Sequence, residues 1–204
     1  LPPIPLPRRM WAGGALEFSG DLRVGDRMRR ISRIADVTLK QGRTGSLCFV
    51  SVAHEIETGG RIVVRERQDI VYRDIQVAPE IKQDVSPAPQ GTHRRAVHPT
   101  TILLFRYSAL TFNAHRIHFD REHTIKVEGY PGLVVHGPMQ AALLFNFATE
   151  LRGLPPSSYN YRSLSPLFDI ADFALAAEGG PDAMQLWTCH DGGPLAMTSQ
   201  ARWS

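Results

Sequence analysis

Three long segments in the first half of the chain alternate apolar and polar residues, and this pattern limits the possible fold more than any other feature. They read MRRISRIADVTLK (28–40), LCFVSVAHEIE (47–57) and RIVVRERQDIVYR (61–73), and glycine-containing turns separate them. Successive side chains of a β-strand point to opposite faces of the sheet, so each segment is expected to form a half-buried strand. Three such strands in succession predict an antiparallel meander.

A second set of elements follows a proline-rich stretch. Residues 78–99 contain four prolines and little apolar periodicity, which predicts a linker between an N-terminal half, residues 1–77, and a C-terminal half, residues 100–204. After it we expect a short helix over Thr100–Leu110, then a helix from Gly137 to Gly153, then four short strands over residues 158–203. The second helix has apolar residues on nearly every side, which predicts a buried helix. The expected fold class is α+β, with a long antiparallel sheet wrapped around this helix.

Composition excludes several classes of protein. The 204 residues are 43% hydrophobic and 21% charged, which is typical of a folded globular chain. The net charge is +3 and scattered, so no nucleic-acid partner is expected. No apolar run approaches the roughly 20 residues of a membrane span, so no membrane partner is expected either. Only Cys48 and Cys189 occur, both in strand-like segments, which predicts a reducing compartment: the cytoplasm, or the mitochondrial matrix in a eukaryote. The chain starts LPPIPLPRR, without Met, as a fragment would.

The residues best suited to chemistry lie between Phe105 and Gly137. His118 is the candidate general base, because an imidazole with an ordinary pKa near 6.5 accepts protons at working pH. Asn113 is a candidate to orient a water molecule, and His115 either shares that work or supports the loop. Gly137 begins the buried helix, where a free N–H at the positive end of the helix dipole suits an oxyanion. The alternatives are loop histidines bonded to backbone carbonyls and an ordinary helix start.

Other catalytic chemistries receive less support. His115 and His118 are three residues apart, but the segment has no nearby cysteine and no further histidine at ligand spacing, so no metal is expected. The sequence contains neither GxSxG nor GxxxxGK[ST], and neither cysteine has an adjacent base.

Two strings carry a resemblance to a known family. FNAHRIHFD (112–120) and GYPGLVVHGPM (129–139) are similar to the catalytic half of the MaoC-like hot-dog hydratases and dehydratases. The family motif reads Asp-x-Asn-Pro-x-His, with a later His-Gly-Met. Here Asn113 stands in place of the motif's Asp, His115 in place of its Asn and Arg116 in place of its Pro, whereas His118 and Gly137 match. The strings RRMWAGG, LRVGD, QDIVYR, FRYSALTFNAHRIH and VEGYPGLVVHGP resemble the branch of mesaconyl-C4-CoA hydratases and fungal mitochondrial 3-hydroxyacyl-thioester dehydratases.

The resemblance implies a double hot-dog whose first unit is incomplete at the N-terminus. It implies a hydro-lyase that reversibly hydrates an enoyl-CoA, such as mesaconyl-C4-CoA or itaconyl-CoA, without a metal or redox cofactor. The alternatives are a 3-hydroxyacyl-thioester dehydratase of fatty-acid synthesis and a non-catalytic acyl-CoA-binding module. A homodimer is expected. His118 would be the base, Asn113 the water or acyl holder and Gly137 the oxyanion donor. The candidates for substrate binding are Arg106, Arg116, Arg9, Tyr130 and His115.

Overall fold

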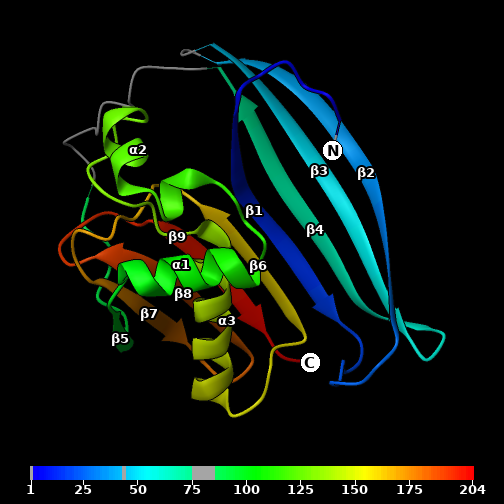
Figure 1. Cartoon of the computed structure of the whole chain (residues 1–204). Coiled ribbons are helices and arrows are strands. Elements are labelled where there is room, and N and C mark those ends of the chain that lie inside the picture. Colours follow the sequence, from blue (N-terminus) through cyan, green and yellow to red (C-terminus); the bar gives the residue numbers. More distant parts are fainter. Residues whose placement is uncertain (1, 43–44, 75–85) are drawn as a thin grey trace.

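The computed structural model describes residues 2–42, 45–74 and 86–204. In these residues nine antiparallel strands form one sheet, in the order β2-β3-β4-β1-β6-β9-β8-β7-β5 (Figure 1). The strands are β1 (Arg8–Phe18), β2 (Met28–Gly42), β3 (Gly45–Thr58), β4 (Arg61–Arg73), β5 (His93–Val97), β6 (Ser158–Ser163), β7 (Phe173–Gly179), β8 (Ala183–His190) and β9 (Met197–Arg202). The helical elements are α1 (Thr101–Leu110), the 3-10 turn η1 (Arg116–His118), α2 (Arg121–Lys126) and α3 (Gly137–Arg152). The predicted α+β class is confirmed.

The first half of the sheet is the predicted meander. β2, β3 and β4 are neighbours, and β1 pairs with β4 on one side and with β6 on the other. The register places Cys48 opposite Tyr72 and Val50 opposite Ile70, and these four side chains belong to one buried cluster. Ile4 and Leu6 of the proline-rich N-terminal arm pack against the same cluster. The turn predicted between β2 and β3 includes residues 43–44, which lie outside the described residues.

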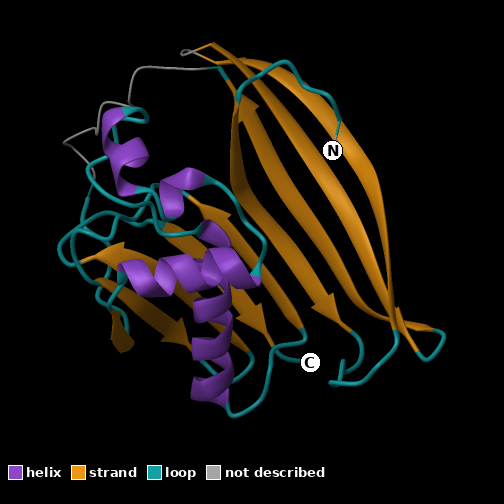
Figure 2. Cartoon of the chain, viewed as in Figure 1, coloured by secondary structure: helices purple, strands orange, loops and turns teal. Residues whose placement is uncertain are grey.

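The second half of the sheet packs around α3. This helix contacts β6, β7, β8 and β9, and Figure 2 shows the helices gathered over this half of the sheet. Leu144 and Ala148 of α3 are fully buried there. Gly153 ends the helix with φ +82°, a left-handed conformation that glycine adopts without a Cβ clash.

One side of α3 differs from the prediction. The sequence predicts burial on nearly every side, but Ala142, Asn146 and Glu150 are exposed and Phe145 is half-buried. Ala142, Phe145 and Asn146 line a groove of about 640 Å³ between the helix and the first half of the sheet. The described residues of the N-terminal half, 2–42 and 45–74, contain no helix that covers this side.

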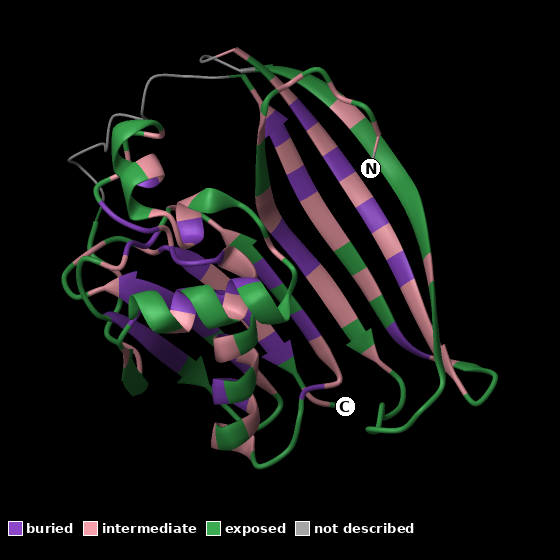
Figure 3. Ribbon diagram, viewed as in Figure 1, coloured by how far each residue is buried: buried purple, intermediate pink, exposed green. Residues whose placement is uncertain are grey.

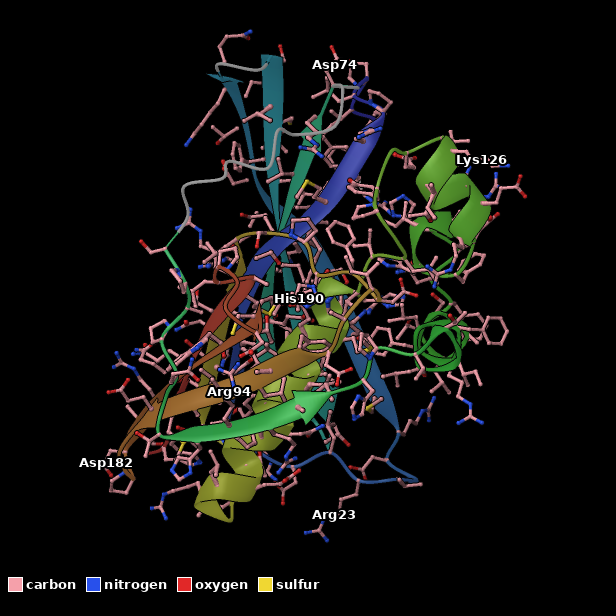
Figure 4. All side chains as sticks on the ribbon, turned by 90° about the vertical axis from the view of Figure 1, so that its left-hand side faces the viewer. Arg23, Asp74, Arg94, Lys126, Asp182 and His190 are labelled. Carbon is pink, nitrogen blue, oxygen red and sulfur yellow. The ribbon has the colours of Figure 1, made fainter. Side chains whose placement is uncertain are left out.

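A strand lies within the segment predicted as a linker. β5 pairs with β7 at the edge of the sheet, with His93 opposite Ala177, and Figure 4 shows it in front of the sheet with Arg94 labelled. Before it the chain runs over β8, where the Trp187 indole N–H donates to the Pro89 carbonyl at 3.0 Å. Residues 78–85 of the predicted linker lie outside the described residues, and the boundary between the halves stays a prediction. Among the described helices, none has both the length and the apolar composition for a membrane span.

Candidate active site

The end of α1 places Asn113. The N–H groups of Phe112 and Asn113 donate to the carbonyls of Ala109 and Ser108, at 3.3 and 2.9 Å, and Phe112 adopts a left-handed φ of +52°. This is a Schellman ending, in which a residue normally glycine turns the chain sharply off the helix. Asn113 Oδ1 then accepts the N–H of His115 at 3.1 Å, which shapes the loop before η1. The side-chain oxygen of Asn113 is therefore engaged in the loop, and its amide nitrogen is the group left for a substrate or water.

His118 lies at the end of η1 with 8% of its surface exposed. Its Nδ1 lies 2.7 Å from the Val134 carbonyl oxygen, which can only accept, so Nδ1 carries the proton and Nε2 carries the lone pair. The Val134 N–H in turn donates to the Ile117 carbonyl at 2.9 Å. Burial lowers the pKa of His118 from 6.5 to about 4, against the opposing effect of the Val134 hydrogen bond. The imidazole is neutral at working pH, and Nε2 can take a proton.

His136 and Ser108 form a buried pair beside the His118 ring. The imidazole of His136 is fully buried, its Nε2 lies 2.8 Å from Ser108 Oγ, and its ring stacks on that of His118 with centroids 3.7 Å apart and planes at 18°. His115 is exposed and meets the His118 ring edge-on, with centroids 5.7 Å apart at 89°. Its side chain makes no capping hydrogen bond to η1, and its role in the loop stays a prediction.

Gly137 follows His136 as the first residue of α3, and its N–H lies in the turn that has no intrahelical acceptor. A Cβ at this position would lie 3.2 Å from the Trp11 ring and 3.5 Å from Ser163 Oγ. Ser163 Oγ is buried without a hydrogen-bond partner among the described residues. A hydroxyl donor and a backbone N–H therefore lie near each other, next to an indole wall from β1.

The three arginine candidates differ in their ion pairs and in their position relative to the groove. Arg116 pairs with Asp120 through two hydrogen bonds, at 3.0 and 2.7 Å. Arg106 lies on the exposed face of α1, whereas the buried face carries Leu104 and Ser108. Arg9 lines the groove together with Trp11 and Pro138, and its charge acts on His115. Of the three arginine candidates, Arg9 is the one that lines the groove.

Tyr130 is half-buried and packs near Phe168, with ring centroids 5.8 Å apart. The loop that carries it is fixed at Leu133, whose N–H donates to Asp169 Oδ1 at 2.8 Å. The Asp169 side chain is 2% exposed and pairs with Arg121. This buried carboxylate anchors the backbone just before Val134, the acceptor for His118.

Sequence reasoning missed four contributors: Ser108, Trp11, Val134 and Ser163. Val134 acts through its backbone oxygen, which leaves no mark on residue type. Ser108 is one turn after Leu104 on the buried face of α1, so a polar residue in an apolar stripe was the available signal. Trp11 and Ser163 lie in other strands, and no local pattern links them to Gly137.

The structure also shows the positions of the residue types that could bind a metal and of the two thiols. Within the described residues no three His, Cys, Asp or Glu side chains are arranged to hold a metal ion. Cys48 and Cys189 are free and buried, and both lie in strands, as predicted for their location.

Comparisons with known proteins identify the family. The profile of the family described as hydroxyacyl-thioester dehydratase type 2 matches residues 1–169. The mesaconyl-C(4)-CoA hydratase of Chloroflexus aurantiacus is 43% identical over 200 residues, which are 98% of this chain and 71% of that protein. The predicted resemblance is confirmed.

Two solved structures share the fold. A MaoC-like dehydratase from Phytophthora capsici superimposes with a TM-score of 0.74 at 12% identity, covering 96% of this chain and 72% of that one. A Mycobacterium tuberculosis protein with a double hot-dog fold superimposes with a TM-score of 0.59 at 13% identity, covering 97% and 75%. The fold is the predicted double hot-dog, and the chain belongs to the hydroxyacyl-thioester dehydratase type 2 family.

Proposed function

We propose that this protein is a hydro-lyase that reversibly hydrates an enoyl-CoA thioester, with a short branched or dicarboxylic acyl group such as mesaconyl-C4 or itaconyl. The observation that carries the proposal is the neutral, tautomer-fixed imidazole of His118 beside the first turn of α3. The 43% identity to a mesaconyl-C(4)-CoA hydratase supports the substrate class.

His118 and Gly137 divide the reaction between them. His118 Nε2 takes a proton from water as the water oxygen bonds to Cβ, and the π electrons move toward the thioester oxygen. The Gly137 N–H stabilises that oxygen as it becomes negative. The imidazolium then returns a proton to Cα, and dehydration is the same path reversed. The Asn113 amide nitrogen holds the water or the acyl group. These steps require no metal or redox cofactor.

A dicarboxylic acyl group needs a cation for its free carboxylate. Arg9 is the candidate, because Arg116 is already paired with Asp120 and neither Arg116 nor Arg106 lines the groove. Arg9 also lines the groove that passes Pro138, one residue from Gly137. His115 and Tyr130 remain proposed contacts of the CoA ester.

The experiment is a screen at the enoyl-thioester absorbance with mesaconyl-, itaconyl-, crotonyl- and long-chain enoyl-CoA. Arg9→Gln is compared with Arg106→Gln as the matched control. We expect Arg9→Gln to lower kcat/KM roughly 10–10²-fold for mesaconyl-C4-CoA and little for crotonyl-CoA, because only the former carries a second carboxylate. Arg106→Gln should match the wild type. Equal losses on both substrates would remove Arg9 from carboxylate recognition, and no turnover of any substrate by the wild type would refute the hydratase assignment.

The second candidate is a 3-hydroxyacyl-thioester dehydratase of fatty-acid synthesis, favoured by the matching family profile. Faster turnover of carrier-bound 3-hydroxyacyl chains than of any CoA ester would establish it. A non-catalytic acyl-CoA-binding module would bind the esters without turnover.

The remaining parts of the proposal concern assembly and location. We expect a homodimer, because the edge strand β2 is exposed along nearly its whole length and unpaired edges favour association (Figure 3). We expect a reducing compartment, cytoplasmic or mitochondrial matrix, in keeping with two free buried thiols.

A further inference from the structure

We propose that His136, anchored by Ser108, is a positioning residue that holds the ring of His118 in the orientation needed for proton transfer. The inference rests on the proposed role of His118 as the base. Neither His136 nor Ser108 is proposed to touch the reacting atoms.

The anchor comes from α1. Ser108 and Tyr107 lie on its inner face, and Ser108 Oγ is 2.8 Å from His136 Nε2. The Tyr107 ring packs on His136 with centroids 4.8 Å apart and planes at 56°. His136 has no exposed surface, so its ring is held by a hydrogen bond and by packing. A fixed plane is therefore available on one face of His118.

The protonation of His136 follows from its other nitrogen. Nδ1 is buried and has no hydrogen-bond partner among the described residues. A buried N–H without an acceptor is rarer in proteins than a buried acceptor without a donor. We therefore assign the proton to Nε2, where it is donated to Ser108 Oγ, and leave Nδ1 as a bare lone pair. His136 is then a neutral ring whose hydrogen bond fixes its orientation.

His118 needs this second restraint. Its hydrogen bond to the Val134 carbonyl fixes where Nδ1 lies but lets the ring tilt about the line joining the two atoms. The stack on His136, at 3.7 Å and 18°, removes that freedom and so sets the direction of Nε2. It also covers one ring face, which excludes water that would favour the protonated form.

Several other titrating groups surround the two rings. Burial raises the pKa of Tyr107, and His115 acts electrostatically on both His118 and His136. Glu128, Arg8, Arg9 and His123 in turn act on His115. Burial is the largest cause of the lowered pKa of both rings, about 4 for His118 and about 3 for His136. A looser stack should therefore let water reach His118 and raise its pKa.

The first half of the sheet offers a matched control. His54 of β3 is also buried, and its Nδ1 lies 2.7 Å from Ser32 Oγ of β2. Ser108→Ala and Ser32→Ala each remove one hydroxyl from one buried histidine. His136→Phe keeps a stacked ring without the hydrogen bond, and His136→Ala removes the ring.

We expect Ser108→Ala to lower kcat roughly 10–10²-fold, with KM little changed, because a misdirected base loses reactive geometry rather than substrate affinity. The acid limb of its kcat/KM profile should move upward toward pH 6.5. Ser32→Ala should leave both unchanged, and His136→Phe should retain more activity than His136→Ala. The ¹⁵N imidazole spectrum of the wild type should show His118 as the Nδ1–H tautomer, with a mixture of tautomers in Ser108→Ala.

Three results would overturn the positioning role: a wild-type rate in Ser108→Ala, a pH midpoint and tautomer that do not move while the rate falls, or equal losses in His136→Phe and His136→Ala. The last two would mean that the pair only supports the fold. Failure of the proposed function is distinguishable, because full activity in His118→Ala would refute the base itself. A dead His118→Ala beside an unaffected Ser108→Ala would refute only the present inference.

Discussion

The two halves of the sheet are built from similar antiparallel strands, but only the second is crossed by a long helix in the described residues. Where α3 packs on the strands, Leu144 of the helix and Leu175 of β7 are 0% and 2% exposed. In the first half, the inner residues of β3 are buried, yet Leu39 and Ile34 of β2 remain 75% and 51% exposed. Alternating sequence is enough to make a sheet, but full burial of its apolar face requires a second layer.

The same contrast separates two buried histidines. His54 and His118 are 7% and 8% exposed, and each has one polar partner for Nδ1. His118 also lies beside a stacked ring and a helix N-terminus, whereas His54 lies within a strand. Burial of an imidazole does not make a catalytic base, and the neighbouring groups decide its role.

The largest effect should come from replacing each of these two histidines with alanine in separate variants. We expect His118→Ala to lower hydration about 10²–10⁴-fold with CoA-ester binding little changed, because a general base contributes roughly this much. His54→Ala should keep near wild-type turnover. Steady-state kinetics with the best substrate of the screen measure both, and a His54→Ala enzyme as slow as His118→Ala would break the contrast.

A second pair of variants compares packing in the two halves. Leu144→Ala should lower the free energy of unfolding by about 2–5 kcal/mol, because it opens a cavity in a fully buried layer. Leu39→Ala should change it by less than about 0.5 kcal/mol, since three-quarters of that side chain is exposed. Urea unfolding followed by circular dichroism provides the measurement. Equal losses would mean that the β2 face is covered in solution.

The third comparison concerns pH. The folded-state pKa values of His118 and His136, about 4 and about 3, lie below the ordinary 6.5 because burial disfavours the charged rings. The unfolded chain therefore binds more protons below pH 6.5. The two rings therefore do not lower the free energy of unfolding above pH 6.5. Below that pH the free energy of unfolding should decrease as the pH drops toward 4.

Urea midpoints between pH 7 and 4 test this dependence, and a His118→Gln, His136→Gln double variant provides the control. The variant should show a shallower decline than the wild type, because glutamine does not titrate. Identical slopes would show that the stability of the second half is not linked to these two rings.

Much of the fold follows from local pattern. The alternation in residues 28–73 predicts three strands, and Pro138 and Gly153 predict the ends of α3 correctly. β5 was missed because five residues among prolines carry too little periodicity to stand out from a linker. The exposed side of α3 was missed because apolar composition indicates what a helix can bury, not which neighbours it meets.

The candidate site divides in the same way. Sequence alone determined that His118 is a base candidate and that Gly137 begins a helix, because residue chemistry and helix ends are local properties. Only the tertiary structure decided that Ser108 reaches His136, that Trp11 and Ser163 lie against Gly137, and that Arg9 lines the groove beside Pro138. The physical reason is that these contacts join separate elements, and they depend on how a helix and two strands pack in three dimensions.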